Sequence, residues 1–297
     1  MALPLESVPN FSEGRDGHLI DAIGAALARP ARLLDVHSDP DHNRSVYTVV
    51  GTGDELVEAL LDGIRVAVER IDVHAHAGTH PRIGAADVVP LVPLRPEQEA
   101  DARAAALALA ERLGSELELP VFFYGRLTED QREPAFYRRG GLAELDGRLA
   151  AGEVVPDRGP SALHPTAGGV IVGVRRPLIA FNVNLRSRDV EVAREIARSV
   201  RERDGGFPGV RALGLELLHA GVVQVSMNVT DWEAAALHEI VERIEAEAAA
   251  RGVEVSGSEL VGLMPAGAAA AAAGRMLRLE RFDPAQVLEL RVLDERD

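Results

Sequence analysis

The stretch 178–229 reads LIAFNVNLRSRDVEVAREIARSVRERDGGFPGVRALGLELLHAGVVQVSMNV, and its pattern predicts a strand, a helix and two further strands. One more helix and one more strand are predicted after it. The predicted strands are 178–184, 210–218, 222–229 and 253–261, and the predicted helices are 190–203 and 231–251. Strand, helix, two strands, helix, strand is the order of a ferredoxin-like sandwich, in which two helices cover one sheet.

The N-terminal part of the chain has a similar order of elements before an extra helix and strand. The predicted strands there are 3–9, 33–37, 45–50, 87–94 and 121–124, and the predicted helices are 17–28, 54–71 and 96–117. Residues 136–151 look helical in two pieces that Gly140 and Gly141 separate. We therefore expect an α/β (α+β) fold with two ferredoxin-like-related α/β sandwich subdomains, each a mixed or antiparallel sheet with helices packed on it.

The segment 156–169, PDRGPSALHPTAGG, separates these two parts. Glycine and proline are frequent in its first half, and a structureless segment of this length is usually a linker or a binding loop. The strand pattern begins again at Gly169. We therefore expect one subdomain over residues 1–168 and another over residues 169–297.

The composition excludes several kinds of chemistry. The chain has no cysteine and no lysine, so all 32 basic residues are arginines. Thiol nucleophiles, thiolate metal sites, Schiff bases and a lysine-bearing phosphate loop are thereby excluded. The formal net charge of −15 argues against nonspecific nucleic-acid binding. The sequence has no signal-peptide pattern and no apolar stretch long enough to span a bilayer, so we expect a cytoplasmic protein without a membrane partner.

The stretch 71–94, IDVHAHAGTHPRIGAADVVPLVPL, contains three histidines within seven residues. Histidine titrates near neutral pH, so His80, on a loop beside Pro81, is a candidate general acid and base. Together, His74, His76 and His80 could instead form a zinc site of a metal-dependent hydrolase, in which three histidines leave one position open for water. Packing or surface roles for His74 and His76 also fit the pattern.

Other polar residues of the N-terminal part are candidate substrate ligands. Arg82 could hold a carboxylate or orient Asp87, and Arg44 offers a second guanidinium. Asp39 offers a carboxylate for a cationic group, although a plain Asx turn explains it nearly as well. Asn10 lies at the end of the first predicted strand, where α/β proteins often place site residues.

Six blocks of the sequence give it a resemblance to the formiminotransferase family. They are VPNFSEGR (8–15), DPDHNRSVYTVVG (39–51), GTHPRIGAADVVPLVPL (78–94), PDRGPSALHPTAGGVIVGVRRPLIAFNVNL (156–185), VQVSMNVTDW (223–232) and GSELVGLMP (257–265). The resemblance implies transfer of the formimidoyl group of N-formimidoyl-L-glutamate to N5 of tetrahydrofolate. It also implies two α/β subdomains, a homodimer, tetrahydrofolate as co-substrate and no metal.

The resemblance further assigns roles to particular residues. The family's catalytic histidine falls on His80, with Asp39 as our candidate for the cationic amidine and Asn10, Arg44 and Arg82 as our candidate substrate ligands. The family's folate-binding segment falls on Asp157, Arg158, Gly159, Pro160, Ser161, Ala162, Leu163, His164, Pro165, Thr166 and Ala167. Thr79 stands where the family usually has an acidic residue, and Arg158 where an aromatic residue is common.

Three alternatives to this activity remain open from the sequence. The donor could be N-formylglutamate, a question that Thr79 raises. The metal-dependent hydrolase built on the three histidines is the second alternative, and a non-catalytic folate-binding protein is the third. In animals the family's domain is fused to a cyclodeaminase, and we expect any such second activity to belong to a separate protein here.

Overall fold

The computed structural model describes residues 3–279, 282–288 and 290–291. The remaining residues, which the predicted domain ranges include, lie outside this description. The chain divides into two compact units between Arg176 and Pro177. Within the described residues, no helix is both long enough and apolar enough to cross a membrane.

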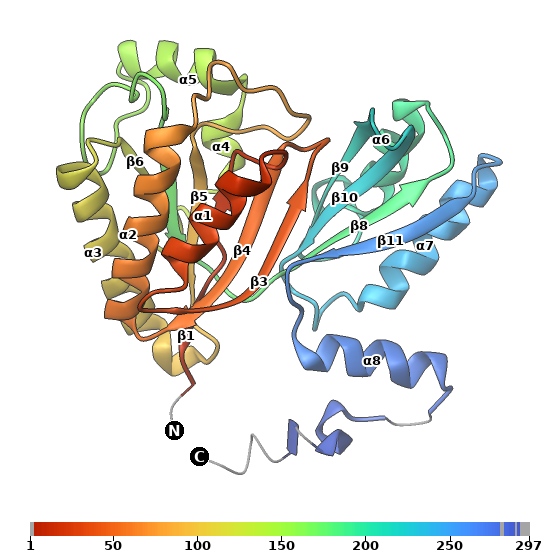
Figure 1. Cartoon of the computed structure of the whole chain (residues 1–297). Coiled ribbons are helices and arrows are strands. Elements are labelled where there is room, and N and C mark those ends of the chain that lie inside the picture. Colours follow the sequence, from red (N-terminus) through yellow and green to blue (C-terminus); the bar gives the residue numbers. More distant parts are fainter. Residues whose placement is uncertain (1–2, 280–281, 289, 292–297) are drawn as a thin grey trace. The chain divides into compact units, whose positions relative to one another are not determined.

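The first unit is built on a seven-stranded mixed sheet (Figure 1). Its strands are β1 (Leu5–Ser7), β2 (Asn10–Phe11), β3 (Arg32–Asp39), β4 (Arg44–Gly51), β5 (Ala86–Val92), β6 (Val121–Gly125) and β7 (Val170–Val174). They lie in the order β1-β4-β2-β5-β7-β6, and β3 pairs with β4 at one edge. The strands β5, β6 and β7 are parallel, whereas β1 and β2 run antiparallel to their neighbours.

Three long helices cover one face of this sheet (Figure 1). They are α1 (Gly17–Leu27), α2 (Gly53–Arg70) and α3 (Glu99–Glu116), the last preceded by the 3-10 turn η1 (Pro96–Gln98). On α2, Leu56, Leu60 and Ile64 recur every four residues and are fully buried, as the predicted apolar stripe requires. Thr52 begins this helix with a capping box, since its side chain accepts from the Glu55 N–H while Glu55 accepts from the Thr52 N–H.

Two shorter helices pack on the other face of the sheet. They are α4 (Ala135–Arg138) and α5 (Gly141–Ala150), and they are separated at Gly140 as the sequence predicts. Tyr137 of α4 and Leu145 of α5 are fully buried against Phe122 and Ile171 of the sheet.

The second unit has the predicted ferredoxin-like topology. Its strands are β8 (Ile179–Leu185), β9 (Val210–Leu217), β10 (Val222–Val229) and β11 (Val255–Val261), in the order β11-β8-β10-β9, and all pairs are antiparallel. Its helices are α6 (Val190–Val200), α7 (Leu237–Ala250) and α8 (Ala266–Met276), with the 3-10 turns η2 (Glu202–Asp204) and η3 (Pro284–Gln286). Ile196 of α6 and Ile244 of α7 belong to one apolar core with Val183 and Val225 of the sheet.

Two predicted boundaries differ from the structure by more than a few residues. The units divide after Arg176 rather than after residue 168, because Val170–Val174 pairs in parallel with β5 and β6 and so completes the first sheet. The helix expected from Asp231 begins at Leu237, because the Asp231 carboxylate instead accepts the Ala234 N–H in a separate turn.

Candidate active site

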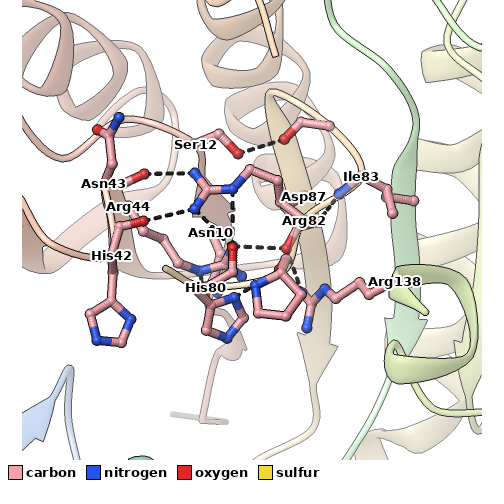
Figure 2. Close-up of polar contacts among 12 residues, drawn as sticks. Asn10, Ser12, His42, Asn43, Arg44, His80, Arg82, Ile83, Asp87 and Arg138 are labelled. Atoms are coloured by element: carbon pink, nitrogen blue, oxygen red, sulfur yellow. Dashed lines mark hydrogen bonds and ion pairs between the residues drawn. The ribbon is translucent and has the colours of Figure 1, made fainter. Parts of the chain in front are cut away.

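Three charged side chains of the first unit, those of Arg44, Asp87 and Arg138, meet where β4 and β5 begin. Both strands run antiparallel to β1, so they start at the same edge of the sheet. Arg44 is the first residue of β4 and Asp87 is the second residue of β5. Nη1 of Arg44 lies 2.8 Å from Oδ2 of Asp87, and Nε of Arg44 donates to Oδ1 of Asn10 at 3.0 Å (Figure 2). Asn10 therefore orients Arg44 through a side-chain hydrogen bond.

A second arginine reaches the same carboxylate. Nη2 of Arg138, at the end of α4, lies 2.5 Å from Oδ2 of Asp87, and the Ile83 N–H donates to Oδ1 at 2.8 Å (Figure 2). The Asp87 side chain is fully buried. Burial alone would raise the pKa of Asp87, but Arg138 and Arg44 outweigh it and hold the pKa well below its usual range. Asp87 is therefore a stable anion between two guanidiniums.

His80 lies next to this cluster in a defined tautomer. Its Nδ1 is 2.8 Å from the Pro81 carbonyl oxygen. Because a carbonyl oxygen only accepts, the proton of the neutral ring is on Nδ1 and the lone pair is on Nε2. Burial, together with the charges of Arg44 and Arg138, lowers the pKa of His80 well below its ordinary value. The ring is therefore neutral at pH 7 and can accept a proton at Nε2.

The Arg82 side chain joins two loops, and each of its N–H groups has an acceptor within the protein. Its guanidinium donates to the carbonyl oxygens of His42 at 2.8 Å, of Asn43 at 3.0 Å and of His80 at 2.8 Å and 3.1 Å. Its Nη1 also lies 2.7 Å from Nδ1 of His76. These contacts use all five N–H groups of an arginine side chain. Arg82 therefore holds the loop that contains His80, and a direct contact of Arg82 with a substrate carboxylate stays a prediction.

Asn43 and Thr79 also join the same two loops, and Asn43 in addition holds the segment that contains Gly14. Oδ1 of Asn43 accepts the Gly14 N–H at 2.9 Å, and its Nδ2 donates to the Ala77 carbonyl at 3.1 Å. Thr79 donates to the Asp41 carbonyl through both its N–H, at 3.2 Å, and its hydroxyl, at 2.8 Å. At Gly78 a Cβ atom would lie 2.3 Å from the His42 carbonyl oxygen, so the loops approach too closely for any other residue.

The structure favours the plain explanation for Asp39. Its Oδ1 accepts the N–H of His42, three residues on, at 2.7 Å, and so stabilises the local turn at the end of β3. That turn leads directly into Arg44. A direct role of Asp39 with substrate stays a prediction.

The predicted folate-binding segment contacts the start of β6 at one end and residues on either side of the His80 loop at the other. The Asp157 carboxylate accepts the Phe123 N–H at 2.7 Å, and Gly159 has a positive φ of 80° where a Cβ would meet the Leu119 carbonyl oxygen. At its other end, the Thr166 and Ala167 carbonyls accept from Val73 and Ala85. Residues 160, 161, 165 and 166 are exposed. Folate binding by this segment stays a prediction.

The three histidines that could form a zinc site have different surroundings and different contacts. The His74 side chain is exposed. Both ring nitrogens of His76 lie within 2.8 Å of Nη1 of Arg82, and its Nε2 also faces the Asn43 carbonyl, while Nδ1 of His80 donates to Pro81. In the part of the chain that the structure describes, no group of three His, Cys, Asp or Glu side chains could hold a metal ion.

Arg138 is the site residue that the sequence did not indicate. It lies 51 positions after Asp87 and belongs to no motif of charged residues around that strand. Its one local feature is that it ends α4, two residues before Gly140 and Gly141 interrupt the helical pattern.

Residues 4–175 match the N-terminal subdomain of the formiminotransferase domain, and residues 180–286 match the formiminotransferase domain. The glutamate formimidoyltransferase of Streptococcus pyogenes serotype M1 is 40% identical over 298 residues, which cover 99% of this chain and 100% of the relative. That of Thermoplasma acidophilum is 39% identical over 96% of each chain.

A bifunctional relative matches over a shorter part of its length. The formimidoyltransferase-cyclodeaminase of Rattus norvegicus is 41% identical over 276 residues, which are 89% of this chain and 51% of the relative. Two adjoining domain matches and full-length relatives at this identity leave no doubt about ancestry. The chain belongs to the formiminotransferase family.

Proposed function

We propose that this protein is a transferase that moves the formimidoyl group of N-formimidoyl-L-glutamate to N5 of tetrahydrofolate. The products are 5-formimidoyltetrahydrofolate and L-glutamate. Two full-length relatives are named glutamate formimidoyltransferase, which supports this activity. The observation that carries the proposal is the neutral His80 ring, with its lone pair on Nε2, beside the Arg44–Asp87–Arg138 cluster.

The chemistry requires one group that both accepts and donates a proton. N5 of tetrahydrofolate attacks the amidine carbon, and a bond from carbon to N5 forms. His80 takes the N5 proton at Nε2 and then delivers it to the glutamate nitrogen, whose bond to carbon breaks. A histidine with a lowered pKa suits the second step, because its protonated form is a strong acid. The glutamate nitrogen then leaves as a neutral amine.

The remaining groups bind and orient the substrates. Arg44, held by Asn10 and Asp87, is the guanidinium for a glutamate carboxylate. Asp39 remains our candidate for the protonated amidine, with the carboxylate oxygen that does not accept from His42. The segment 157–167 is our candidate folate site. In agreement with the family resemblance, we also propose a homodimer in the cytoplasm and a separate cyclodeaminase that acts on the product.

One assay with two donors tests the proposal. Purified protein is mixed with tetrahydrofolate and either N-formimidoylglutamate or N-formylglutamate, and the absorbance of the folate product is followed. We expect the formimidoyl donor to be the better substrate. The H80A variant should turn over about 10²–10⁴-fold more slowly, with little change in tetrahydrofolate affinity.

The H74A variant is the matched control, because it removes an exposed histidine of the same loop. It should keep the wild-type rate. Near-wild-type turnover of H80A would remove His80 from the mechanism, and tetrahydrofolate binding without turnover of either donor would favour a folate-binding protein.

A further inference from the structure

Arg138 has no part in the proton transfers, yet it lies in the same cluster as His80. We propose that Arg138 binds one carboxylate of the donor, so that Arg44 and Arg138 together receive the donor's two carboxylates. This inference rests on the proposed function. It makes Arg138 a specificity-determining residue, selecting dicarboxylate donors.

The first support is charge. Asp87 is one carboxylate shared by two arginines, and all three side chains are at most 15% exposed. One positive charge in this buried group therefore has no anionic partner within it. Burying an unpaired charge is costly unless a ligand of opposite charge completes the site. An anionic substrate would supply that charge.

The second support is the set of open donors on Arg138. Nη2 donates to Asp87, and this is the one hydrogen bond that the Arg138 guanidinium makes among the described residues, although the side chain is still 15% exposed. In contrast, Arg82 uses every donor on protein acceptors. A guanidinium that donates one N–H to protein and keeps its other Nη hydrogens free can bind a carboxylate in a bidentate manner.

The third support is that α4 holds Arg138 in place without a substrate. The neighbouring Tyr137 is fully buried, donates its hydroxyl to the Phe123 carbonyl at 2.8 Å, and packs its ring 5.0 Å from that of Phe122. Arg148 donates to the Phe136 carbonyl at 2.8 Å. These contacts fix the backbone next to Arg138, so the guanidinium is already oriented before a ligand binds.

The test combines two variants with three donors. R138Q removes the charge, and R139Q is the matched control, because Arg139 is exposed and its ion pair among the described residues is with Glu144, at 3.3 Å. The donors are N-formimidoylglutamate, N-formimidoylglutamine, which lacks the side-chain carboxylate, and N-formimidoyl-4-aminobutyrate, which lacks the α-carboxylate.

We expect R138Q to raise the KM for N-formimidoylglutamate by about 10–100-fold, with a much smaller change for tetrahydrofolate. One of the two analogues should lose little from R138Q, since it already lacks the carboxylate that Arg138 binds. The carboxylate that is missing from this analogue is the one that Arg138 binds in the natural donor. R138K, which retains the charge but not the planar fork, should recover only part of the affinity.

An equal loss for all three donors, or a fall in kcat with unchanged KM, would overturn the proposal. Calorimetric titration with L-glutamate, at matched thermal stability of the variants, tests the inference without turnover. If the wild type transfers nothing to tetrahydrofolate but binds L-glutamate more tightly than R138Q does, the proposed function fails and the carboxylate site stands. Equal L-glutamate affinity of wild type, R138Q and R139Q would overturn the site itself.

Discussion

Nη1 of Arg44 lies 2.8 Å from Oδ2 of Asp87, and the two side chains are 7% and 0% exposed. So deep an ion pair is expensive to build, because both charges leave water. The cost is offset here because Asp87 also forms an ion pair with Arg138 and accepts a hydrogen bond from the Ile83 N–H. The pair lies at the start of β4 and β5, where the sheet aligns residues 43 positions apart.

We predict that D87N lowers the free energy of unfolding by about 3–5 kcal/mol, because it leaves two buried guanidiniums without an anion. The measurement is equilibrium unfolding in denaturant at pH 7. The matched control is E58Q, which breaks an ion pair of 2.5 Å with Arg112 at the surface and should change stability by no more than about 1 kcal/mol. Equal effects of the two substitutions would contradict the role given to burial.

The R82Q variant should lower kcat much more than it raises the KM for the donor. The reason is that Arg82 holds the carbonyls of His42, Asn43 and His80 and so positions the His80 loop. Steady-state kinetics with both substrates make this distinction. R15Q is the control, since Arg15 donates to a single loop carbonyl, that of Pro40. A selective rise in the donor KM for R82Q would instead restore Arg82 as a carboxylate ligand.

Local patterns of the sequence predicted most elements of the fold but not their long-range partners. The four strands of the second unit follow the predicted order, because each is a separate apolar run between turn residues. The strand Val170–Val174 was placed in the wrong unit, since an apolar run does not reveal which sheet it joins. The same limit explains Arg138, whose partner Asp87 is far away in the sequence.

The sequence likewise indicated those site residues that stand in local motifs, but not the contacts that they make. His80 and Arg44 stand in recognisable blocks, and the structure places both next to Asp87. Arg82 was expected to bind a carboxylate because its side chain is suited to one. In the structure its acceptors are mainly backbone carbonyls, which every residue has and which no sequence pattern can single out.

Thr79 should matter for the loop through its hydroxyl. We expect T79S to keep wild-type turnover and stability, because serine can still donate to the Asp41 carbonyl. T79V keeps the shape but loses this hydrogen bond, so it should cost about 1 kcal/mol of stability and lower turnover. Thermal unfolding and the transferase assay measure both effects. Full activity of T79V would show that the backbone N–H of residue 79 is enough to hold the loop.

The final prediction concerns how the free energy of unfolding falls as the pH is lowered below neutrality. Burial and the charge of Arg82 lower the pKa of His76 to about 4, and its Nδ1 faces the Arg82 guanidinium at 2.7 Å. The unfolded chain therefore takes up this proton first as the pH falls, near the ordinary histidine pKa of about 6.5. Native stability should consequently be lost between about pH 6.5 and pH 4, by at most about 1.4 kcal/mol per pH unit and by less than this because the ring is only half-buried.

The H76N variant should flatten this slope, since it removes the group that titrates differently in the two states. Denaturant unfolding at half-unit steps from pH 7 to pH 4 measures the slope, and H74N, which removes an exposed histidine two positions earlier, is the matched control. His80 also has a lowered pKa and titrates differently in the two states over this range, so the H76N slope should be reduced but not abolished. If H76N and the wild type lose stability in parallel, His76 is protonated equally easily in both states, and its contact with Arg82 contributes nothing to the native fold.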